Sequence, residues 1–136
     1  MTLLAHPDQG VGWLGDVLRL TDSGATRLVE RLVGQGSLRR GSGAEARTRT
    51  LRLTAAGRRR ARRILAERER QLEVVLAPLS SAERRTLERL LGKVVAGLVD
   101  GRPAALRACR LCDRDACRAH DAACPLQHTV PSGGVP

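Results

Sequence analysis

The chain has 136 residues, and its 24 Lys and Arg against 14 Asp and Glu give a net charge of +10 at pH 7. This balance favours a phosphate-bearing partner, although scattered arginines alone do not prove one. A single Trp and no Tyr or Phe exclude the aromatic stacking of bases used by single-strand and RNA binders, which leaves duplex DNA. No stretch reaches the roughly 18 apolar residues of a membrane span, and no secretory leader is recognisable, so we expect a one-domain cytoplasmic protein without a membrane contact.

A short amphipathic helix is predicted over residues 11–18. Its apolar side chains recur at helical spacing; they are Val11, Trp13, Leu14, Val17 and Leu18. A tight turn over residues 19–21 joins it to a second helix. Two short helices with such a turn indicate a helix-turn-helix, the motif that places its second helix in the major groove of DNA.

The second helix is predicted over residues 21–33. Thr21, Asp22 or Ser23 can cap it by accepting a hydrogen bond from a free N–H, and Gly34 follows its last turn. Its period gives an inward face and an outward face. The inward residues are Ala25, Leu28, Val29 and Leu32, and the outward residues are Ser23, Thr26, Arg27 and Glu30.

A β-hairpin is predicted after this helix. Residues 37–40 and 50–54 alternate between apolar and polar side chains, and the connection over residues 41–49 is rich in Gly and Arg. Its arginines are better placed to meet DNA than those elsewhere in the chain; they are Arg39, Arg40, Arg47 and Arg49. A helix-turn-helix followed by such a hairpin is a winged helix.

The hairpin resembles the wing of the MarR family of bacterial transcriptional regulators. That wing carries an Asp-x-Arg step, then an aliphatic residue, a Leu and a Thr. Here the matching residues are Glu45-Ala46-Arg47, Leu51, Leu53 and Thr54, with Glu45 in place of Asp. Gly57 falls where the family has a glycine after its Leu-Thr pair, and the resemblance covers about residues 3–99.

The resemblance implies a fold, a site and a partner. The fold is mainly α with a small β-hairpin wing: a winged helix-turn-helix over residues 1–54, followed by two long dimerisation helices over residues 55–101. Arg47 would enter the minor groove, while Ser23, Ala25, Thr26 and Arg27 would face the bases. With the wing arginines, the implied DNA-binding residues are Ser23, Ala25, Thr26, Arg27, Arg39, Arg40, Arg47 and Arg49. Many relatives also bind a small-molecule effector.

Two long helices are predicted after the wing. The first runs over residues 55–77 and ends before Pro78, and its cluster Arg58, Arg59, Arg60, Arg62 and Arg63 is expected to be a solvated face. The second opens with the capping box Ser80-Ser81-Ala82-Glu83. Its stripe of Leu and Val needs a partner, which the resemblance implies to be a second copy; the alternative is packing on the first long helix alone.

The chain departs from the family at its N-terminus. No counterpart of the first dimerisation helix precedes residue 11, and residues 1–6 look like the end of a second one. Either the start was assigned late or the chain is a shortened variant. Without those helices a dimer would lose part of its apolar interface, so we expect a weak homodimer.

All four cysteines lie in the tail after residue 101: Cys109, Cys112, Cys117 and Cys124. Cytosolic thiols stay reduced, so clustered cysteines there bind metal or sense redox state more often than they form disulfides. Four close thiolates could form a zinc site or hold an iron–sulfur cluster, although neither spacing matches closely, and a thiol switch is the alternative. His120 or His128 could replace one cysteine. We predict a cysteine-rich metal-binding tail over residues 102–128 and disorder over residues 129–136.

These patterns predict a sequence-specific regulator of transcription that binds double-stranded DNA, acts as a repressor and responds to metal or redox state at the cysteine tail. The alternative is a truncated partner that pairs with a full-length relative rather than binding DNA alone. An enzyme is not expected, because the sequence lacks a Ser-His-Asp grouping, a phosphate loop and paired carboxylates.

Overall fold

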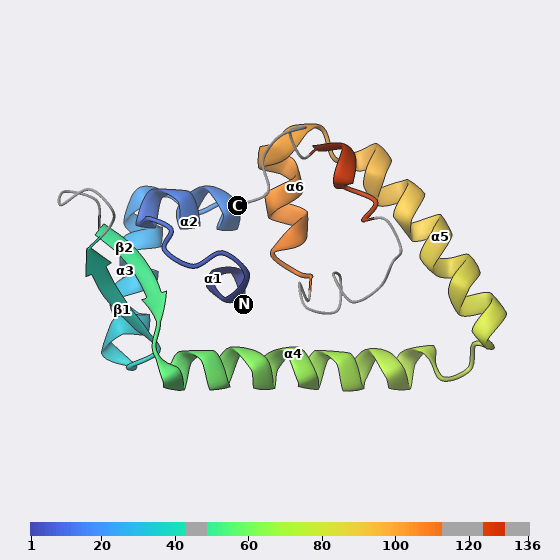
Figure 1. Cartoon of the computed structure of the whole chain (residues 1–136), viewed down its shortest axis with the longest axis horizontal. Helices are drawn as coiled ribbons and strands as arrows, with labels where there is room; N and C mark the ends of the chain where they lie inside the picture. Colours follow the sequence, from blue (N-terminus) through green and yellow to red (C-terminus); the bar gives the residue numbers. More distant parts are fainter. Residues whose placement is uncertain (43–48, 113–123, 130–136) are drawn as a thin grey trace. The chain divides into compact units, whose positions relative to one another are not determined.

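A computed structural model describes residues 1–42, 49–112 and 124–129 (Figure 1). The elements in chain order are α1 Thr2–Ala5, α2 Val11–Leu18, α3 Asp22–Gly34, β1 Leu38–Ser42, β2 Arg49–Leu53, α4 Ala55–Leu76, α5 Ser81–Leu98, α6 Gly101–Cys109 and the short 3₁₀ helix η1 Gln127–Thr129. The predicted fold class, helices with one small hairpin, is confirmed.

The chain divides into two compact units, Met1–Glu67 and Arg68–Pro136. The boundary falls inside the long helix α4, so this helix contributes its first half to one unit and its second half to the other. The first unit therefore extends beyond the predicted winged helix-turn-helix of residues 1–54, as far as Glu67.

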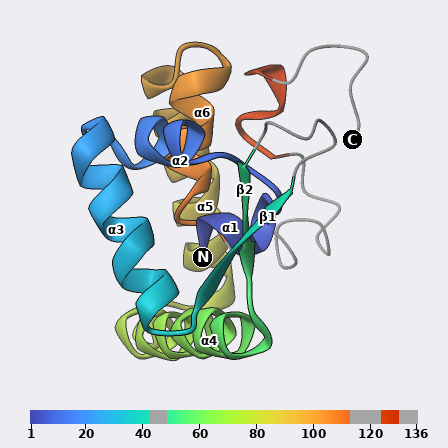
Figure 2. The same cartoon turned by 90° about the vertical axis from the view of Figure 1, so that its left-hand side faces the viewer.

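The core of the first unit draws a side chain from every element that precedes α4. Its buried members are Leu3, Leu14, Val29, Leu38 and Leu51, and the half-buried side chains packed against them are Val11, Trp13, Leu18, Leu32 and Leu53. Figure 2 shows α1, α2, α3 and the hairpin gathered around this centre. Aliphatic side chains alone thus fill the core, with Trp13 at its margin.

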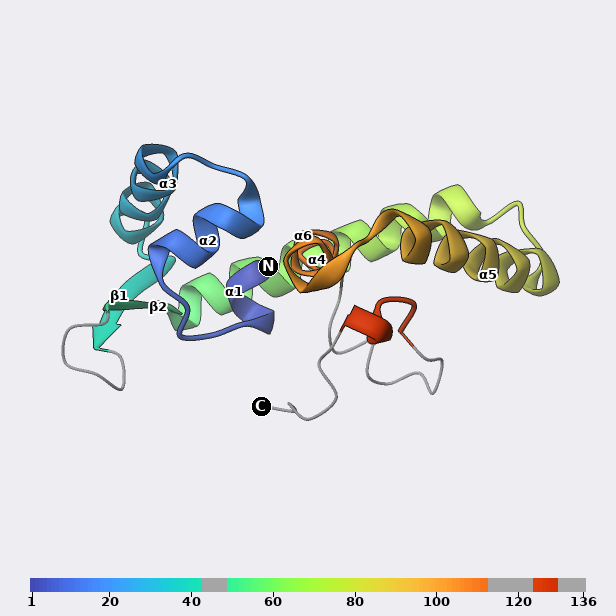
Figure 3. The ribbon, with the colours of Figure 1, turned by 90° about the horizontal axis from the view of Figure 1, so that it is seen from above.

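The helix-turn-helix is held by close contact of α2 and α3 (Figure 3). Arg19 ends α2 in the left-handed conformation, with φ of 56°, and the amide of Leu20 donates to the carbonyl of Gly15 at 2.9 Å. A Cβ at Gly15 would lie 3.1 Å from Cβ of Ala25, so a larger residue there would crowd the two helices. Of the three predicted caps, Thr21 is the one observed: its hydroxyl accepts from the amide of Gly24 at 3.2 Å.

The hairpin pairs Leu38 with Leu53 and Arg40 with Leu51 in antiparallel register. Its strands differ by one or two residues from the prediction: the Ser37 amide bonds to the Leu32 carbonyl instead of across the hairpin, and both strands extend further toward the tip. On the edge of β2 that faces away from β1, the amide of Leu51 donates to the carbonyl of Gln9 at 2.8 Å. The segment before α2 therefore supports β2 directly.

The second unit begins within α4 and continues through α5, which follows a turn that contains Pro78. The predicted capping box of α5 is confirmed: the Ser80 hydroxyl accepts from the amide of Glu83, and the Glu83 carboxylate accepts from the amide of Ser80. None of the described helices combines the length and apolar character required to cross a membrane.

The tail contains ordered structure that the sequence did not predict. Helix α6 follows α5, and η1 packs against it; Ala105 of α6 and Leu126, just before η1, are 0% and 5% exposed. Pro125 lies against α5, since a Cβ at Gly92 would be 3.7 Å from its Cβ. Thr129, the first residue of the segment expected to be disordered, ends η1 and donates its hydroxyl to the carbonyl of Leu126 at 2.7 Å. Residues 130–136 lie outside the described residues.

Candidate nucleic-acid interface

The outer face of α3 is polar and exposed, as predicted. Ser23, Thr26 and Arg27 are all exposed near its N-terminal end, where the unpaired amides of a helix favour phosphate. Ala25 differs: its side chain is fully buried against Gly15. Ala25 therefore supports the face from behind and cannot reach a base with its own methyl group, which corrects its predicted place among the base-facing residues.

The wing adds positive charge beside this face. Arg39 and Arg40 are exposed on β1, and Arg49 is exposed at the start of β2. Leu38 and Leu51 are 3% and 1% exposed and hold the hairpin on the core, while Arg39 and Arg40 remain exposed. Arg47 lies outside the described residues.

One arginine of the wing, Arg52, forms an ion pair within the chain. The guanidinium of Arg52 donates from Nε to the carboxylate of Asp8, and this hydrogen bond, with the attraction of the two charges, raises the pKa of Arg52 above its ordinary value. Asp8 adopts a left-handed conformation, with φ of 62°. Arg52 thus links the wing to the segment before α2.

The five arginines at the start of α4 are all exposed, as expected for a solvated face, and two of them also bond to the preceding segments of the chain. Arg58 donates from Nη1 to the carbonyl of Leu53 at 2.9 Å. Arg60 donates from Nη1 to Oε1 of Gln35 and to Oγ of Ser37, both at 3.3 Å. The sequence carried a weak signal for Arg60, because it lies three residues after Gly57 and so near the same side of the helix.

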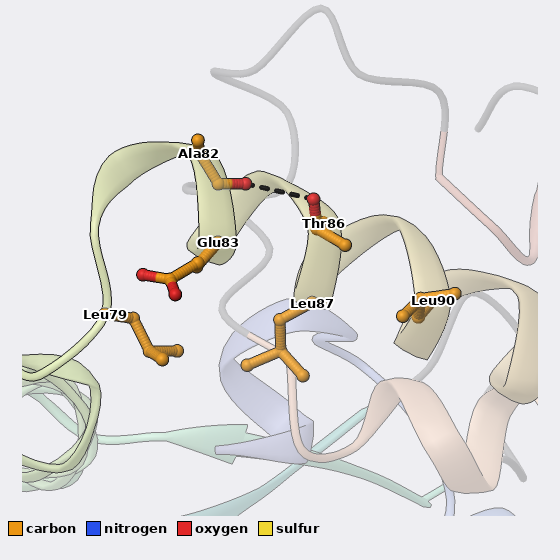
Figure 4. Close-up of a pocket in the computed structure, with 6 residues that line it drawn as sticks. All are labelled: Leu79, Ala82, Glu83, Thr86, Leu87 and Leu90. Atoms are coloured by element: carbon orange, nitrogen blue, oxygen red, sulfur yellow. Dashed lines mark hydrogen bonds between the residues drawn. The ribbon is translucent and has the colours of Figure 1, made fainter.

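The long helices present an exposed apolar surface. No residue of α5 is buried, and the exposed large apolar side chains of α4 and α5 are Ile64, Leu72, Val74, Val75, Leu90, Leu91, Val94 and Leu98. Figure 4 shows a shallow apolar depression where α5 begins, with Leu79, Leu87 and Leu90 around it and the Thr86 hydroxyl donating to the carbonyl of Ala82 at 3.0 Å. Of the predicted stripe of α5, Leu90, Leu91, Val94 and Leu98 therefore stay exposed within the described chain, while Leu87, Val95 and Val99 are half-buried.

The described cysteines do not form a metal site by themselves. Cys109 is half-buried at the end of α6, Cys112 is exposed one turn later, and Cys124 is half-buried before η1. Cys117 and His120 lie outside the described residues, and across residues 1–42, 49–112 and 124–129 no three His, Cys, Asp or Glu side chains group as metal ligands.

The ring of His128, a suggested substitute ligand, lies with Nδ1 3.1 Å from the carbonyl of Pro125. Its nearest partner is therefore backbone of its own turn.

No protein-family model matches the chain, and no curated protein sequence matches it. Solved structures do. A MarR family protein from Bacillus stearothermophilus is 30% identical with a TM-score of 0.67, and the match covers 72% of this chain and 69% of that one. RV1404 from Mycobacterium tuberculosis is 26% identical with a TM-score of 0.63, over 74% of this chain and 70% of that one. The PcaV transcriptional regulator from Streptomyces coelicolor, solved with its natural ligand, is 31% identical with a TM-score of 0.50, over 68% of this chain and 66% of that one.

Proposed function

Because the chain belongs to the MarR family of transcriptional regulators, we propose that it represses transcription by binding a specific duplex DNA sequence as a homodimer. These relatives are regulators, so the prediction that the chain is not an enzyme is confirmed. The observation that carries the proposal is the exposed polar face of α3 beside an arginine-bearing hairpin, both fixed on one aliphatic core.

Base readout is assigned to α3. Thr26 and Arg27 lie one turn from its N-terminus with their side chains in solvent, and an arginine can donate two parallel hydrogen bonds to guanine in the major groove. Ser23, which shares a 3.3 Å hydrogen bond with Thr21, lies where a phosphate oxygen could accept from its hydroxyl or from a free amide.

Backbone contacts are assigned to the wing. Arg39, Arg40 and Arg49 would neutralise phosphates, and Arg47 would reach the minor groove by analogy with the family. Each contact of this kind releases counterions, so the affinity should fall steeply with salt.

The dimer is assigned to the uncovered apolar surface of α4 and α5. Two copies of a surface that contains Leu91, Val94 and Leu98 at helical spacing can cover each other, and a two-fold dimer presents two copies of α3 to a palindromic site.

The cysteine tail is proposed to regulate this dimer by holding zinc or an iron–sulfur cluster. The four thiols would be the ligands, and thiolates suit both groups. The support in the described residues is the connection of this tail to α5: η1, which follows Cys124, packs on α6, and Pro125 contacts α5 beside Gly92. An absorption spectrum of protein purified without oxygen tests the cluster: a broad band near about 400 nm indicates iron–sulfur, and a colourless, zinc-free protein leaves only the thiol switch.

A small-molecule effector is the second candidate regulator. The relative from Streptomyces coelicolor was solved with its natural ligand. A ligand that binds the folded chain raises its melting temperature by mass action, so a thermal-shift screen of small organic acids tests for one.

The test of DNA binding uses Arg27→Ala and Arg47→Ala against the charge-matched Arg62→Ala in α4. The probe is the duplex that the wild-type protein selects from a randomised pool. Arg27→Ala should weaken binding by about 1–3 kcal/mol and relax the preference at one base pair, and Arg47→Ala should reduce the salt slope by about one. Arg62→Ala should change neither. If the folded wild-type chain selects no duplex, the alternative role of pairing with a full-length relative gains support.

A further inference from the structure

Three elements of the first unit meet at one buried residue, Ser37. It follows the C-terminal end of α3, precedes β1 and lies against the first turn of α4, and it is 6% exposed. Its amide donates to the carbonyl of Leu32 at 2.9 Å, which continues the bonding of α3 into the turn. We name the group of Gln35, Ser37, Thr54, Gly57 and Arg60 the α3–α4 joint.

Thr54 and Gly57 make the backbone half of the joint. The amide of Thr54 donates to the Ser37 carbonyl at 3.1 Å, its hydroxyl donates to the Gly36 carbonyl at 2.6 Å, and the same hydroxyl accepts from the amide of Gly57 at 3.0 Å. A Cβ at Gly57 would lie 1.9 Å from the Ser37 carbonyl oxygen, which no side chain could tolerate. Helix α4 therefore starts in direct backbone contact with the end of the recognition helix.

Arg60 makes the side-chain half of the joint. Gln35 is the C-cap of α3, so the guanidinium of Arg60 reaches that helix end and the following turn together. A cation is also favoured there, because the C-terminal end of a helix carries partial negative charge. Two hydrogen bonds from one planar group restrain rotation more than a single contact would.

We propose that Arg60 is a positioning residue for DNA recognition, which fixes the angle between the recognition helix α3 and the dimerisation helix α4. The inference rests on the proposed function. In a dimer, the separation of the two copies of α3 depends on how each α3 is held on its α4, and the half-sites of a palindrome lie about 34 Å apart or at multiples of that spacing. A restrained joint makes this separation definite.

The test compares Arg60→Gln with Arg59→Gln, which removes the same charge from an exposed position one residue earlier on the same helix. The probe is the duplex selected by the wild-type protein from a randomised pool, with versions lengthened and shortened by one base pair at its centre. Arg60→Gln should reduce the discrimination between these spacings by about three- to tenfold, the size expected for losing a hydrogen bond or two. Arg59→Gln should keep the discrimination, and Arg60→Lys should restore part of it.

Amide hydrogen exchange of the DNA-free protein gives an independent readout. The amides of Gly36 and Ser37, bonded to the carbonyls of Val33 and Leu32, should exchange about three- to tenfold faster in Arg60→Gln and at the wild-type rate in Arg59→Gln. If the two variants match in both exchange and spacing preference, Arg60 is only a surface charge and the inference is wrong. If the wild type selects no duplex, the proposed function fails, and the exchange rates alone decide for or against the joint.

Discussion

Val29 and Leu51 are 0% and 1% exposed in the first unit, whereas Val75 and Leu98 are 70% and 78% exposed in α4 and α5. The two units therefore use the same kinds of aliphatic side chain in opposite ways. The first encloses them among five short elements, and the second leaves them on the surface of long helices. The first unit can therefore be stable by itself, while the long helices need a covering surface to be fully stable.

Leu51→Ala tests the claim that the first unit is self-contained. Removing a buried leucine leaves a cavity, so the free energy of unfolding should fall by about 3 kcal/mol, and the loss should be the same at every protein concentration. Urea denaturation followed by the fluorescence of Trp13, which packs against this core, measures it. Leu20→Ala is the control, because Leu20 is 40% exposed and should cost less than 1 kcal/mol. A loss that shrinks as protein concentration rises would show that the unit depends on association.

The contrast also explains which features could be predicted from the sequence. The bounds of α2, the end of α4 before Pro78 and the capping box of α5 follow from local patterns, in which each residue acts on neighbours three or four positions away. The hairpin followed from alternation and glycine. Its strand ends were off by one or two residues, and at the open end the Ser37 amide bonds to the Leu32 carbonyl instead of across the hairpin.

The features that the sequence did not reveal depend on distant contacts. Arg52 pairs with Asp8 across 44 positions, and Arg60 reaches Gln35 across 25. Nothing in the local sequence distinguishes these two arginines from the other arginines around them, so no local pattern predicts their contacts. Helix α6 was missed for a related reason: its single buried residue, Ala105, is small and is covered by η1 from further along the chain.

Leu91→Glu tests whether the exposed apolar surface of α5 forms the dimer interface. Leu91 is 53% exposed, so the variant should fold like the wild type when dilute. The loss of two buried leucines and the burial of two unpaired charges per dimer should weaken association by more than about 100-fold, since each buried leucine contributes about 1.5–3 kcal/mol. Sedimentation over a range of concentrations measures the change.

Arg89→Gln is the matched control for this dimer test, because it changes the net charge by the same amount from the opposite side of α5. It should leave the dissociation constant within about twofold. Equal association of Leu91→Glu and the wild type would mean that the apolar surface of α5 is covered by something other than a second copy.

Glu83→Gln tests the polar cap at the N-terminus of α5, and its expected effect on stability is the smallest of the three. The Glu83 carboxylate accepts from the hydroxyl of Ser80 at 2.7 Å and from its amide at 2.8 Å, and these bonds lower the pKa of Glu83. A lowered folded-state pKa stabilises the helix above the unfolded value, and this contribution is lost as the pH falls through the folded value. Wild type should therefore be more stable than Glu83→Gln at pH 7, and the difference should shrink as the pH falls below about 4.3, the ordinary value of a glutamate. Circular dichroism melts between pH 7 and pH 3 measure it, with Glu88→Gln, on the same helix beyond the cap, expected to follow the wild type. A difference that persists at pH 3 would mean that Glu83 acts through its shape rather than its charge.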